Sequence, residues 1–143
     1  MFDKIKVLLV CSPYYKDITN NLVNGALDVL KSNQVDYKII NVPGALEIAP
    51  AIKFVIDKAL PFDGFIALGC VIKGETYHFE IVAKESSRGI TDLSIKHSIP
   101  IGNGILTVLN KDQAIKRSEP LKLNKGADAA LACLSLIKIK NST

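Results

Sequence analysis

The sequence predicts an α/β fold of three layers, in which a four-stranded parallel sheet lies between helices on both of its faces. Two observations favour this fold. Short apolar segments alternate with longer segments of helical periodicity along the 143 residues. The apolar segments are nearly continuous, as expected for parallel strands buried on both faces. No linker, repeat or low-complexity stretch divides the sequence, so we expect residues 1–143 to form one domain.

The first half of the chain reads as strand, helix, strand, helix. Residues 5–10 are apolar apart from Lys6 and predict the first strand, and residues 37–42 predict the second. The helix between them has one apolar face, made of Ile18, Leu22, Gly25, Ala26, Val29 and Leu30. The helix after the second strand has an apolar face made of Ile48, Ile52, Val55, Ile56 and Ala59.

The second half continues the alternation. Residues 64–68 predict the third strand, and residues 99–106 predict the fourth, interrupted by the glycine-containing stretch 102–104. The helix between these strands has an apolar face made of Phe79, Val82, Ala83, Ser86, Ile90 and Leu93. A short helix at 113–117 and a longer helix at 125–139 complete the chain.

The composition is that of a globular domain, with 48% hydrophobic and 22% charged residues. No apolar run approaches the roughly 18 residues that span a bilayer, so no membrane partner is expected. The net charge is +4, and the Lys and Arg residues are scattered, which gives no indication of nucleic-acid binding. Residues 1–7 carry no signal- or transit-peptide pattern, so we expect a cytoplasmic protein. The three cysteines lack metal-ligand spacing, so no metal site is expected.

The residues of unusual chemistry follow the predicted strand ends. They occupy positions 12–15, 43–47, 69–78 and 102–104. Ligands of parallel sheets bind outside the carboxyl ends of the strands, so these four loops are expected to form one site. The first loop has no glycine and no GxGxxG or Walker motif, which argues against a dinucleotide or a nucleoside triphosphate.

Two residues of these loops each have two interpretations. The ring of Tyr14 could stack on a flat heterocycle, or it could cap the edge of the sheet. The carboxylate of Glu47 could accept hydrogen bonds from ligand hydroxyl groups, or it could complement the dipole of the helix that it begins. The sequence leaves both pairs of interpretations open.

His78 is the residue best placed for acid–base chemistry. A helix is expected to begin near Thr76, so His78 falls in its first turn. The free N–H groups of such a turn favour phosphates, and an imidazole can transfer protons near neutral pH. Cys70, beside the preceding glycine turn, is either a core thiol or a nucleophile. Arg117 is either a surface cation or a bidentate phosphate ligand.

Several short motifs together resemble the lumazine synthase family. Residues 42–48, Val-Pro-Gly-Ala-Leu-Glu-Ile, are similar to the family's VPGA-aromatic-E-[IL]. Residues 69–78, Gly-Cys-Val-Ile-Lys-Gly-Glu-Thr-Tyr-His, are similar to its G-x-V-I-[RK]-G-x-T-x-H. Residues 113–117 and 124–126 stand at the expected spacing, and the resemblance extends over about residues 5–136.

The resemblance implies a flavodoxin-like, Rossmann-like fold and a transferase of riboflavin biosynthesis. In that family 5-amino-6-(D-ribitylamino)uracil condenses with 3,4-dihydroxy-2-butanone 4-phosphate to 6,7-dimethyl-8-ribityllumazine, with release of phosphate and water. No cofactor is implied, and His78 is implied to be catalytic. The residues implied to bind the ribitylaminouracil are Tyr14, Ala45, Leu46, Glu47, Cys70, Val71, Ile72 and Asn103. Those implied to bind the butanone phosphate are Glu75, Thr76 and Arg117, with Lys125 in a supporting position.

The resemblance also implies a homo-oligomer, a pentamer with sites between subunits, and a functional link to riboflavin synthase. Asn103 and Arg117 would come from the adjacent subunit. Leu46 stands where an aromatic residue is common, and Asn103 where Phe is frequent, so the site would have less ring stacking and a more polar wall. Residues 118–123 lack the glycine of the linker in capsid-forming members, which favours pentamers that do not close into a shell.

Two other functions stay open. The chain could bind a flavin or a lumazine as a non-catalytic carrier or sensor, although such a protein would need neither His78 nor Arg117. It could also be a hydrolase that uses Cys70 and His78. These two residues are separated by a turn, and no further residue orients the histidine, which disfavours the hydrolase.

Overall fold

The computed structural model describes residues 4–143, and the first three residues of the N-terminal segment considered above lie outside the described part. The elements are β1 (Lys6–Cys11), α1 (Lys16–Ser32), β2 (Asp36–Asn41), η1 (Ala45–Glu47), α2 (Ile48–Asp57), β3 (Gly64–Ile72), α3 (His78–His97), β4 (Ile101–Val108), α4 (Lys111–Ser118) and α5 (Lys125–Ser142). Every predicted strand and helix is present. Within residues 4–143, no helix is long and apolar enough to cross a membrane.

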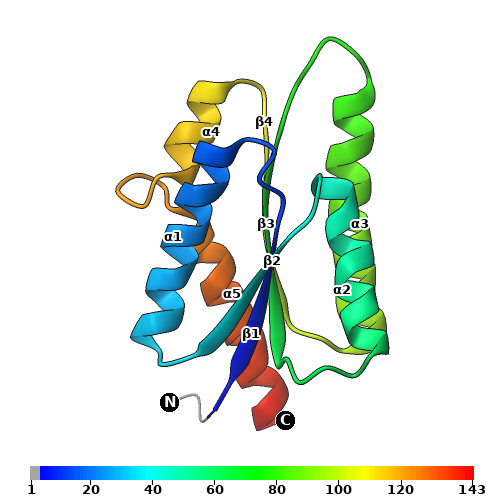
Figure 1. Cartoon of the computed structure of the whole chain (residues 1–143), viewed down its shortest axis with the longest axis vertical. Helices are drawn as coiled ribbons and strands as arrows, with labels where there is room; N and C mark the ends of the chain where they lie inside the picture. The colour runs from blue at the N-terminus through cyan, green and yellow to red at the C-terminus, as the bar shows by residue number, and fades with distance from the viewer. Residues whose placement is uncertain (1–3) are drawn as a thin grey trace.

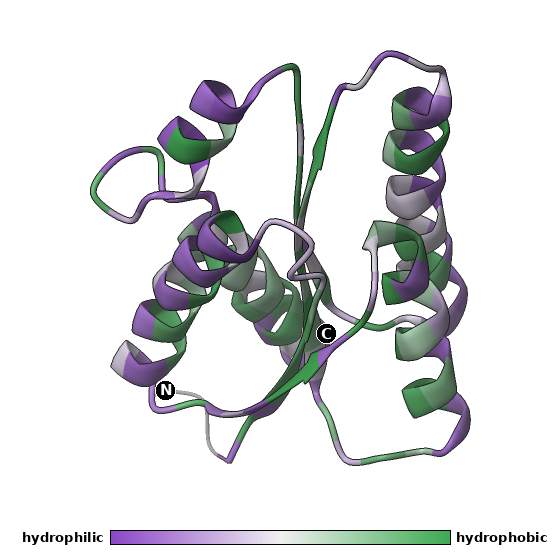
Figure 2. Cartoon of the chain, turned by 45° about the horizontal axis from the view of Figure 1, so that its top comes forward, coloured by the Kyte–Doolittle hydropathy of each residue, from purple (hydrophilic) through white to green (hydrophobic). Residues whose placement is uncertain are grey.

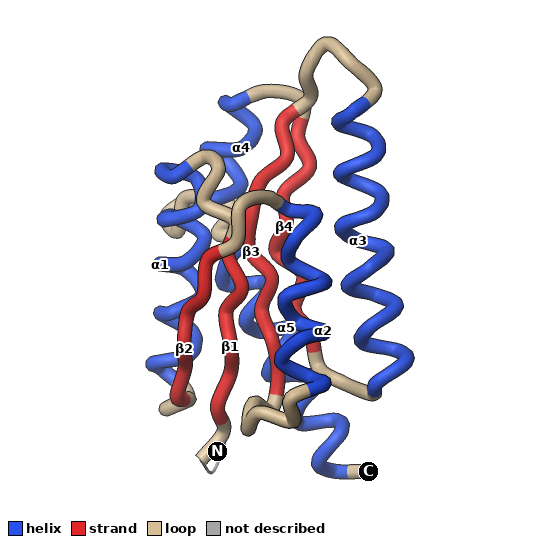
Figure 3. Tube along the Cα trace, turned by 45° about the vertical axis from the view of Figure 1, so that its right-hand side comes forward, coloured by secondary structure: helices blue, strands red, loops and turns tan. Residues whose placement is uncertain are grey.

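The four strands form one sheet in the order β2-β1-β3-β4, and each neighbouring pair is parallel. Helices α1, α4 and α5 cover one face of this sheet, and α2 and α3 cover the other (Figure 1; Figure 3). The predicted three-layer α/β fold is therefore confirmed. All four strands run toward the same edge, so the loops that follow them meet there.

The core consists of two apolar layers, one on each face of the sheet. Successive residues of a strand point to opposite faces, so Val7 and Leu9 pack toward α1 and α5, and Leu8 and Val10 pack toward α2 and α3. Each of these side chains is at most 1% exposed. Burying one such side chain contributes roughly 1.5–3 kcal/mol to folding. The helices carry both hydrophobic and hydrophilic residues (Figure 2), and several large hydrophobic side chains on them are exposed, among them Phe54 in α2, Ile95 in α3 and Ile139 in α5.

The expectation that every strand is buried on both faces is wrong for β2. Five of its six residues are exposed, including Tyr37 and Ile39. The physical reason is its position at the edge of the sheet, where it pairs only with β1. Asp36, Lys38 and Asn41 make this strand more polar than the others, but the periodicity of a sequence alone does not distinguish an edge strand from a central one.

Strand β3 is longer than predicted. It continues past Leu68 and includes Gly69–Ile72, so these residues belong to the strand and not to a turn. They pair with β4 as far as Val108, whereas the pairing between β1 and β3 stops at Leu68. The last part of β3 therefore has a strand neighbour on one side only.

The predicted interruption of the fourth strand at residues 102–104 is also wrong. Residues 102–104 belong to the regular ladder of β4 and pair with Ile66, Ala67 and Leu68 of β3. The glycines serve close packing, because a Cβ atom on Gly102 would collide with the carbonyl of Ala129 in α5. Helix α2 also ends before the last residue of its predicted apolar face. Ala59 lies beyond this helix, with a φ of 51°.

Candidate functional site

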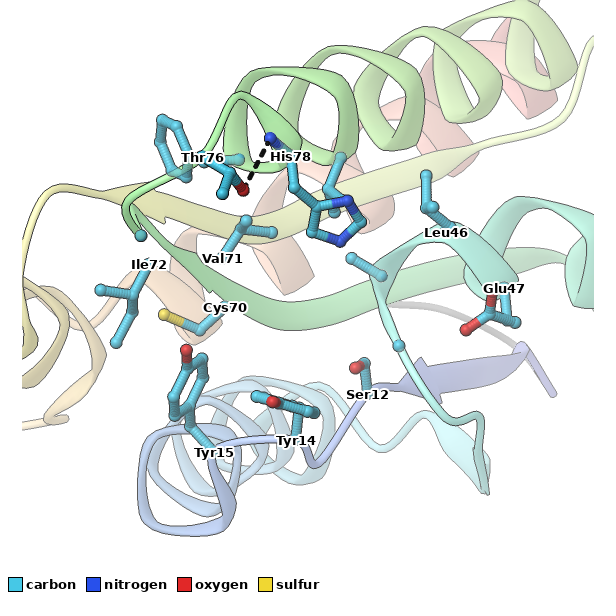
Figure 4. Close-up of a pocket in the computed structure, with 15 residues that line it drawn as sticks. Ser12, Tyr14, Tyr15, Leu46, Glu47, Cys70, Val71, Ile72, Thr76 and His78 are labelled. Carbon is cyan, nitrogen blue, oxygen red and sulfur yellow. Dashed lines mark hydrogen bonds between the residues drawn. The ribbon is translucent and has the colours of Figure 1, made fainter.

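A pocket of about 420 Å³ lies at the carboxyl ends of β1 and β3, between the start of α1 and the start of α3. Its walls come from three loops and from the end of β3. The lining residues are Ser12, Tyr14, Tyr15, Gly44, Ala45, Leu46, Glu47, Cys70, Val71, Ile72, Gly74, Thr76, His78, Phe79 and Val82. Figure 4 shows the labelled members of this set, with Tyr14 on one side of the pocket and His78 on the other.

Most of the residues predicted for the site meet in this pocket, which we call the first pocket. Those that line it are Tyr14, Ala45, Leu46, Glu47, Cys70, Val71, Ile72, Thr76 and His78. Glu75 lies in the same loop as Thr76 but does not line the cavity. Three of the four loops expected at this edge of the sheet therefore come together.

The Pro-Gly turn after β2 holds Glu47 in place. The amide of Glu47 donates to the carbonyl of Gly44 at 3.1 Å, which closes the short helix η1. A Cβ atom on Gly44 would lie 3.1 Å from Glu47 Oε1, so the absence of a side chain leaves room for the carboxylate. Ala45 anchors the turn by packing with Val71 and Val82.

His78 is the first residue of α3, as predicted. Its amide donates to Thr76 Oγ1 at 3.4 Å, so Thr76 satisfies one of the free N–H groups at the helix start. The imidazole itself is exposed and points over the pocket (Figure 4). Glu75 and Thr76 lie before α3, which begins at His78. The prediction that their amides belong to the start of this helix is therefore wrong by two residues or more.

Cys70 lies within β3 and not beside a turn, contrary to the prediction. Its side chain is 6% exposed, and burial raises the pKa of the thiol to about 11. A thiol with this pKa is protonated at neutral pH and is a poor nucleophile. The hydrolase hypothesis is therefore disfavoured by the structure as well as by the sequence.

Asn103, Arg117 and Lys125 lie elsewhere. They line a second pocket of about 460 Å³ between β4 and the start of α5, together with Asp128. Within residues 4–143 the two pockets share no lining residue. The chain thus carries two groups of predicted site residues in separate pockets, and it does not bring them together.

Asn103, Arg117 and Lys125 each have a local partner in the second pocket. Asn103 Oδ1 accepts from the amide of Ile105 at 3.0 Å. Arg117 Nη1 donates to the carbonyl of Gln113 at 3.2 Å, and Lys125 Nζ lies 3.3 Å from a carboxylate oxygen of Asp128. Arg117 keeps further donors on its guanidinium, so it remains able to bind an anion.

The sequence reasoning missed several residues of the first pocket, among them Ser12 and Phe79. Ser12 follows directly after β1 and belongs to the loop 12–15 that was expected at the site, but no role was assigned to it. Phe79 was interpreted only as part of the apolar face of α3. Its position beside His78 gives it a second role as a wall of the pocket.

Comparison with known proteins decides between the remaining hypotheses. Residues 4–141 match the family model described as 6,7-dimethyl-8-ribityllumazine synthase. The chain belongs to the lumazine synthase family. The match covers the pocket-forming loops and both groups of site residues, so the resemblance of the short motifs is confirmed.

Curated members of the lumazine synthase family are similar over nearly the whole chain. A 6,7-dimethyl-8-ribityllumazine synthase of Bartonella bacilliformis is 50% identical over 135 residues, which cover 94% of this chain and 89% of the relative. One from Bartonella tribocorum is 47% identical, covering 98% and 93%. A 6,7-dimethyl-8-ribityllumazine synthase 1 of Rhodopseudomonas palustris is 48% identical, covering 94% and 85%.

A solved structure shares the fold without close sequence similarity. It is a chain described as a lipoprotein fragment from Peptoclostridium difficile, with a TM-score of 0.52 and 11% identity. The match covers 95% of this chain and 99% of the other. At this identity the likeness concerns the architecture alone.

Proposed function

We propose that the protein condenses 5-amino-6-(D-ribitylamino)uracil with 3,4-dihydroxy-2-butanone 4-phosphate. The product is 6,7-dimethyl-8-ribityllumazine, and phosphate and water are released. This is the penultimate step of riboflavin biosynthesis. Membership of the lumazine synthase family over residues 4–141 is the observation that carries the proposal. The first pocket supports it, because it combines an aromatic ring, a carboxylate and a histidine.

The ribitylaminouracil would occupy the part of the first pocket between Tyr14 and β3. The Tyr14 ring is 74% exposed and available for stacking on the pyrimidine. Beyond Leu68, the edge of β3 that faces β1 has no strand partner, so main-chain groups of residues 70–72 can bond the edges of the ring. Glu47 would accept hydrogen bonds from the ribityl hydroxyls.

The butanone phosphate would lie near the start of α3. Amides of Glu75 and Thr76, the dipole of α3 and the Arg117 guanidinium would hold its phosphate. His78 would then stand beside the reacting carbons, and Lys125 would support the charge of the phosphate from the second pocket.

The reaction needs protons to move at each stage, and His78 is the group in the first pocket suited to this task. An amine nitrogen of the aminouracil forms a bond to the ketone carbon, and water leaves to give an imine. Removal of a proton from the carbon beside the imine then expels phosphate from the next carbon with its bonding electrons. The enol that remains takes up a proton and becomes a ketone next to a new methyl group. The second amine closes the ring with loss of water. Alignment of two bound substrates contributes much of the rate gain.

We further propose that the enzyme is a pentamer that acts in the cytoplasm. The first pocket would then be completed by Asn103, Arg117 and Lys125 of the next subunit. The separation of the two pockets within one chain supports this arrangement. A functional link to riboflavin synthase follows from the chemistry, since the lumazine product is the substrate that such an enzyme consumes.

The test is to mix the purified protein with both substrates and to record the fluorescence of the lumazine product. The controls are the uncatalysed reaction and each substrate alone with the protein. Catalysis above the uncatalysed rate supports the proposal. Binding of the product without acceleration of its formation would instead identify a carrier or sensor.

A further inference from the structure

Ser12 is a largely buried residue whose hydroxyl group lies at the wall of the first pocket and has no hydrogen-bond partner among residues 4–143. The residue is 2% exposed, yet it lines the cavity. Within residues 4–143 its hydroxyl group makes no hydrogen bond, whereas its carbonyl does. Because Ser12 lines the cavity, its hydroxyl is free to donate to or accept from a molecule that enters the pocket.

The main chain of Ser12 is held on two sides. Its amide donates to the carbonyl of Leu68 at 2.9 Å, which ties it to β3. Its carbonyl accepts from Thr19 Oγ1 of α1 at 2.8 Å, in a bond that is itself buried. A Cβ atom on Gly69 would lie 3.3 Å from the Cβ of Ser12, so the side chain already packs against β3. The hydroxyl is therefore presented to the pocket from a fixed position.

The location of Ser12 indicates which part of a ligand it meets. Figure 4 shows it between Tyr14 and Glu47. If the pyrimidine stacks on Tyr14 and the far ribityl hydroxyls reach Glu47, as in the proposed function, the residue between them faces the start of the ribityl chain. We propose that the Ser12 hydroxyl binds the ribityl hydroxyl nearest the ring, and this inference rests on the proposed function.

Ser12 and Glu47 would recognise different features of the chain. An ionised carboxylate only accepts hydrogen bonds, whereas a serine hydroxyl both donates and accepts. Ser12 can thus donate to the oxygen of a ribityl hydroxyl while that hydroxyl donates elsewhere. A substrate without this hydroxyl leaves Ser12 unpaired, so the pocket discriminates against it.

The test compares Ser12→Ala with the wild-type enzyme, on the ribityl substrate and on its analogue that lacks the hydroxyl nearest the ring. We expect the KM for the ribityl substrate to rise about three- to tenfold, as for the loss of one neutral hydrogen bond. The KM for the butanone phosphate and kcat should stay within about twofold. With the deoxy analogue, the two proteins should have the same KM. Ser32→Ala, at an exposed serine outside the pocket, is the matched control and should change nothing.

Three outcomes would overturn the inference: an unchanged KM for the ribityl substrate, an equal loss with the deoxy analogue, or a lower melting temperature of the unliganded Ser12→Ala protein. The last would show that the hydroxyl has a structural partner. If the wild-type enzyme forms no lumazine, the proposed function fails, and calorimetric titration of both proteins with the ribitylaminouracil then tests Ser12 by itself. Equal affinities there would count against the inference.

Discussion

Gly102 of β4 lies directly against the carbonyl group of Ala129 in α5, and a Cβ atom on the glycine would overlap that carbonyl. We therefore expect Gly102→Ala to push α5 away from the sheet. Overpacking of a core costs about 1–3 kcal/mol, and a clash with the main chain lies at the upper end of this range. Urea denaturation should show this loss of stability. Gly74→Ala is the matched control, because nothing lies within 4 Å of its Cβ position. Equal stability of the two variants would contradict the packing argument.

Removal of the His78 imidazole should lower turnover. His78→Ala is expected to reduce kcat by about ten- to a thousandfold, because proton transfer by a positioned side chain contributes on this scale. Residual activity should remain, since alignment of the two substrates does not depend on the histidine. His97→Ala, at the other end of α3, removes a histidine outside the first pocket and should leave kcat unchanged. An unchanged kcat in His78→Ala would remove this residue from the mechanism.

Arg117→Lys should fail to restore the function of the arginine. A guanidinium binds phosphate through a planar pair of donors, whereas an ammonium acts as a point charge. We expect the KM for the butanone phosphate to rise by about tenfold or more, as for the loss of a charge-assisted hydrogen bond. Lys116→Arg, at the exposed neighbouring position, should have no effect. Equal weakening of both substrates would indicate a structural role for Arg117.

The proposed shared site makes a prediction about assembly. If one site combines the first pocket of one subunit with the second pocket of the next, an isolated subunit cannot be fully active. Light scattering and sedimentation are expected to show pentamers. The linker of residues 118–123, with Leu121 98% exposed, has no glycine, which favours pentamers that do not form a shell. A particle of sixty chains would refute the linker argument, and an active monomer would refute the shared site.

The buried thiols should make the fold sensitive to alkaline pH. Burial raises the pKa of Cys11 and Cys133 to about 12 and that of Cys70 to about 11. The thiol of an unfolded chain has its ordinary pKa of 9.0, so above this pH the unfolded chain binds fewer protons than the folded one. The free energy of unfolding is then expected to fall as pH rises from about 9 towards 12, whereas below pH 9 the thiols add no pH dependence.

Urea denaturation at pH 8 and pH 10.5 measures this effect. Cys133→Ala lacks one of the thiols and should show a smaller loss of stability between the two pH values. Lysine and tyrosine side chains titrate in the same range, so the comparison with the variant is what isolates the thiol. An identical loss in both proteins would rule out a contribution of Cys133.

The order of elements was predictable because strand and helix differ in the period of their apolar residues. The end of β3 was not predictable, because a glycine such as Gly69 usually marks a turn. The residues after it stay in the strand because they pair with β4. Gly102 was misread for a related reason: its role depends on Ala129, a residue far away in the sequence. The exposure of Tyr37 likewise follows from the position of β2 at the edge of the sheet. The order of strands in a sheet cannot be predicted from a local sequence pattern.

The candidate site was more predictable than the fold details. Tyr14, Glu47 and His78 follow strand ends, and the rule for parallel sheets brings such residues together. The same rule placed Asn103 in the group, but β4 carries this residue in its interior, near a different pocket. Ser12 was placed with the loop 12–15 but given no role, because a single serine carries little information until its burial and its position at the pocket are visible.

The extension of β3 beyond β1 has a consequence for how this region can change during evolution. The free edge of Gly69–Ile72 presents main-chain donors and acceptors, and any residue except proline presents the same set. Side chains at these positions can therefore drift within the limits of packing while the hydrogen-bonding pattern of the edge persists. A proline, or a shift in the register of β3 against β4, would remove that pattern. We therefore expect many types of side chain at these positions in related sequences, but the same backbone geometry.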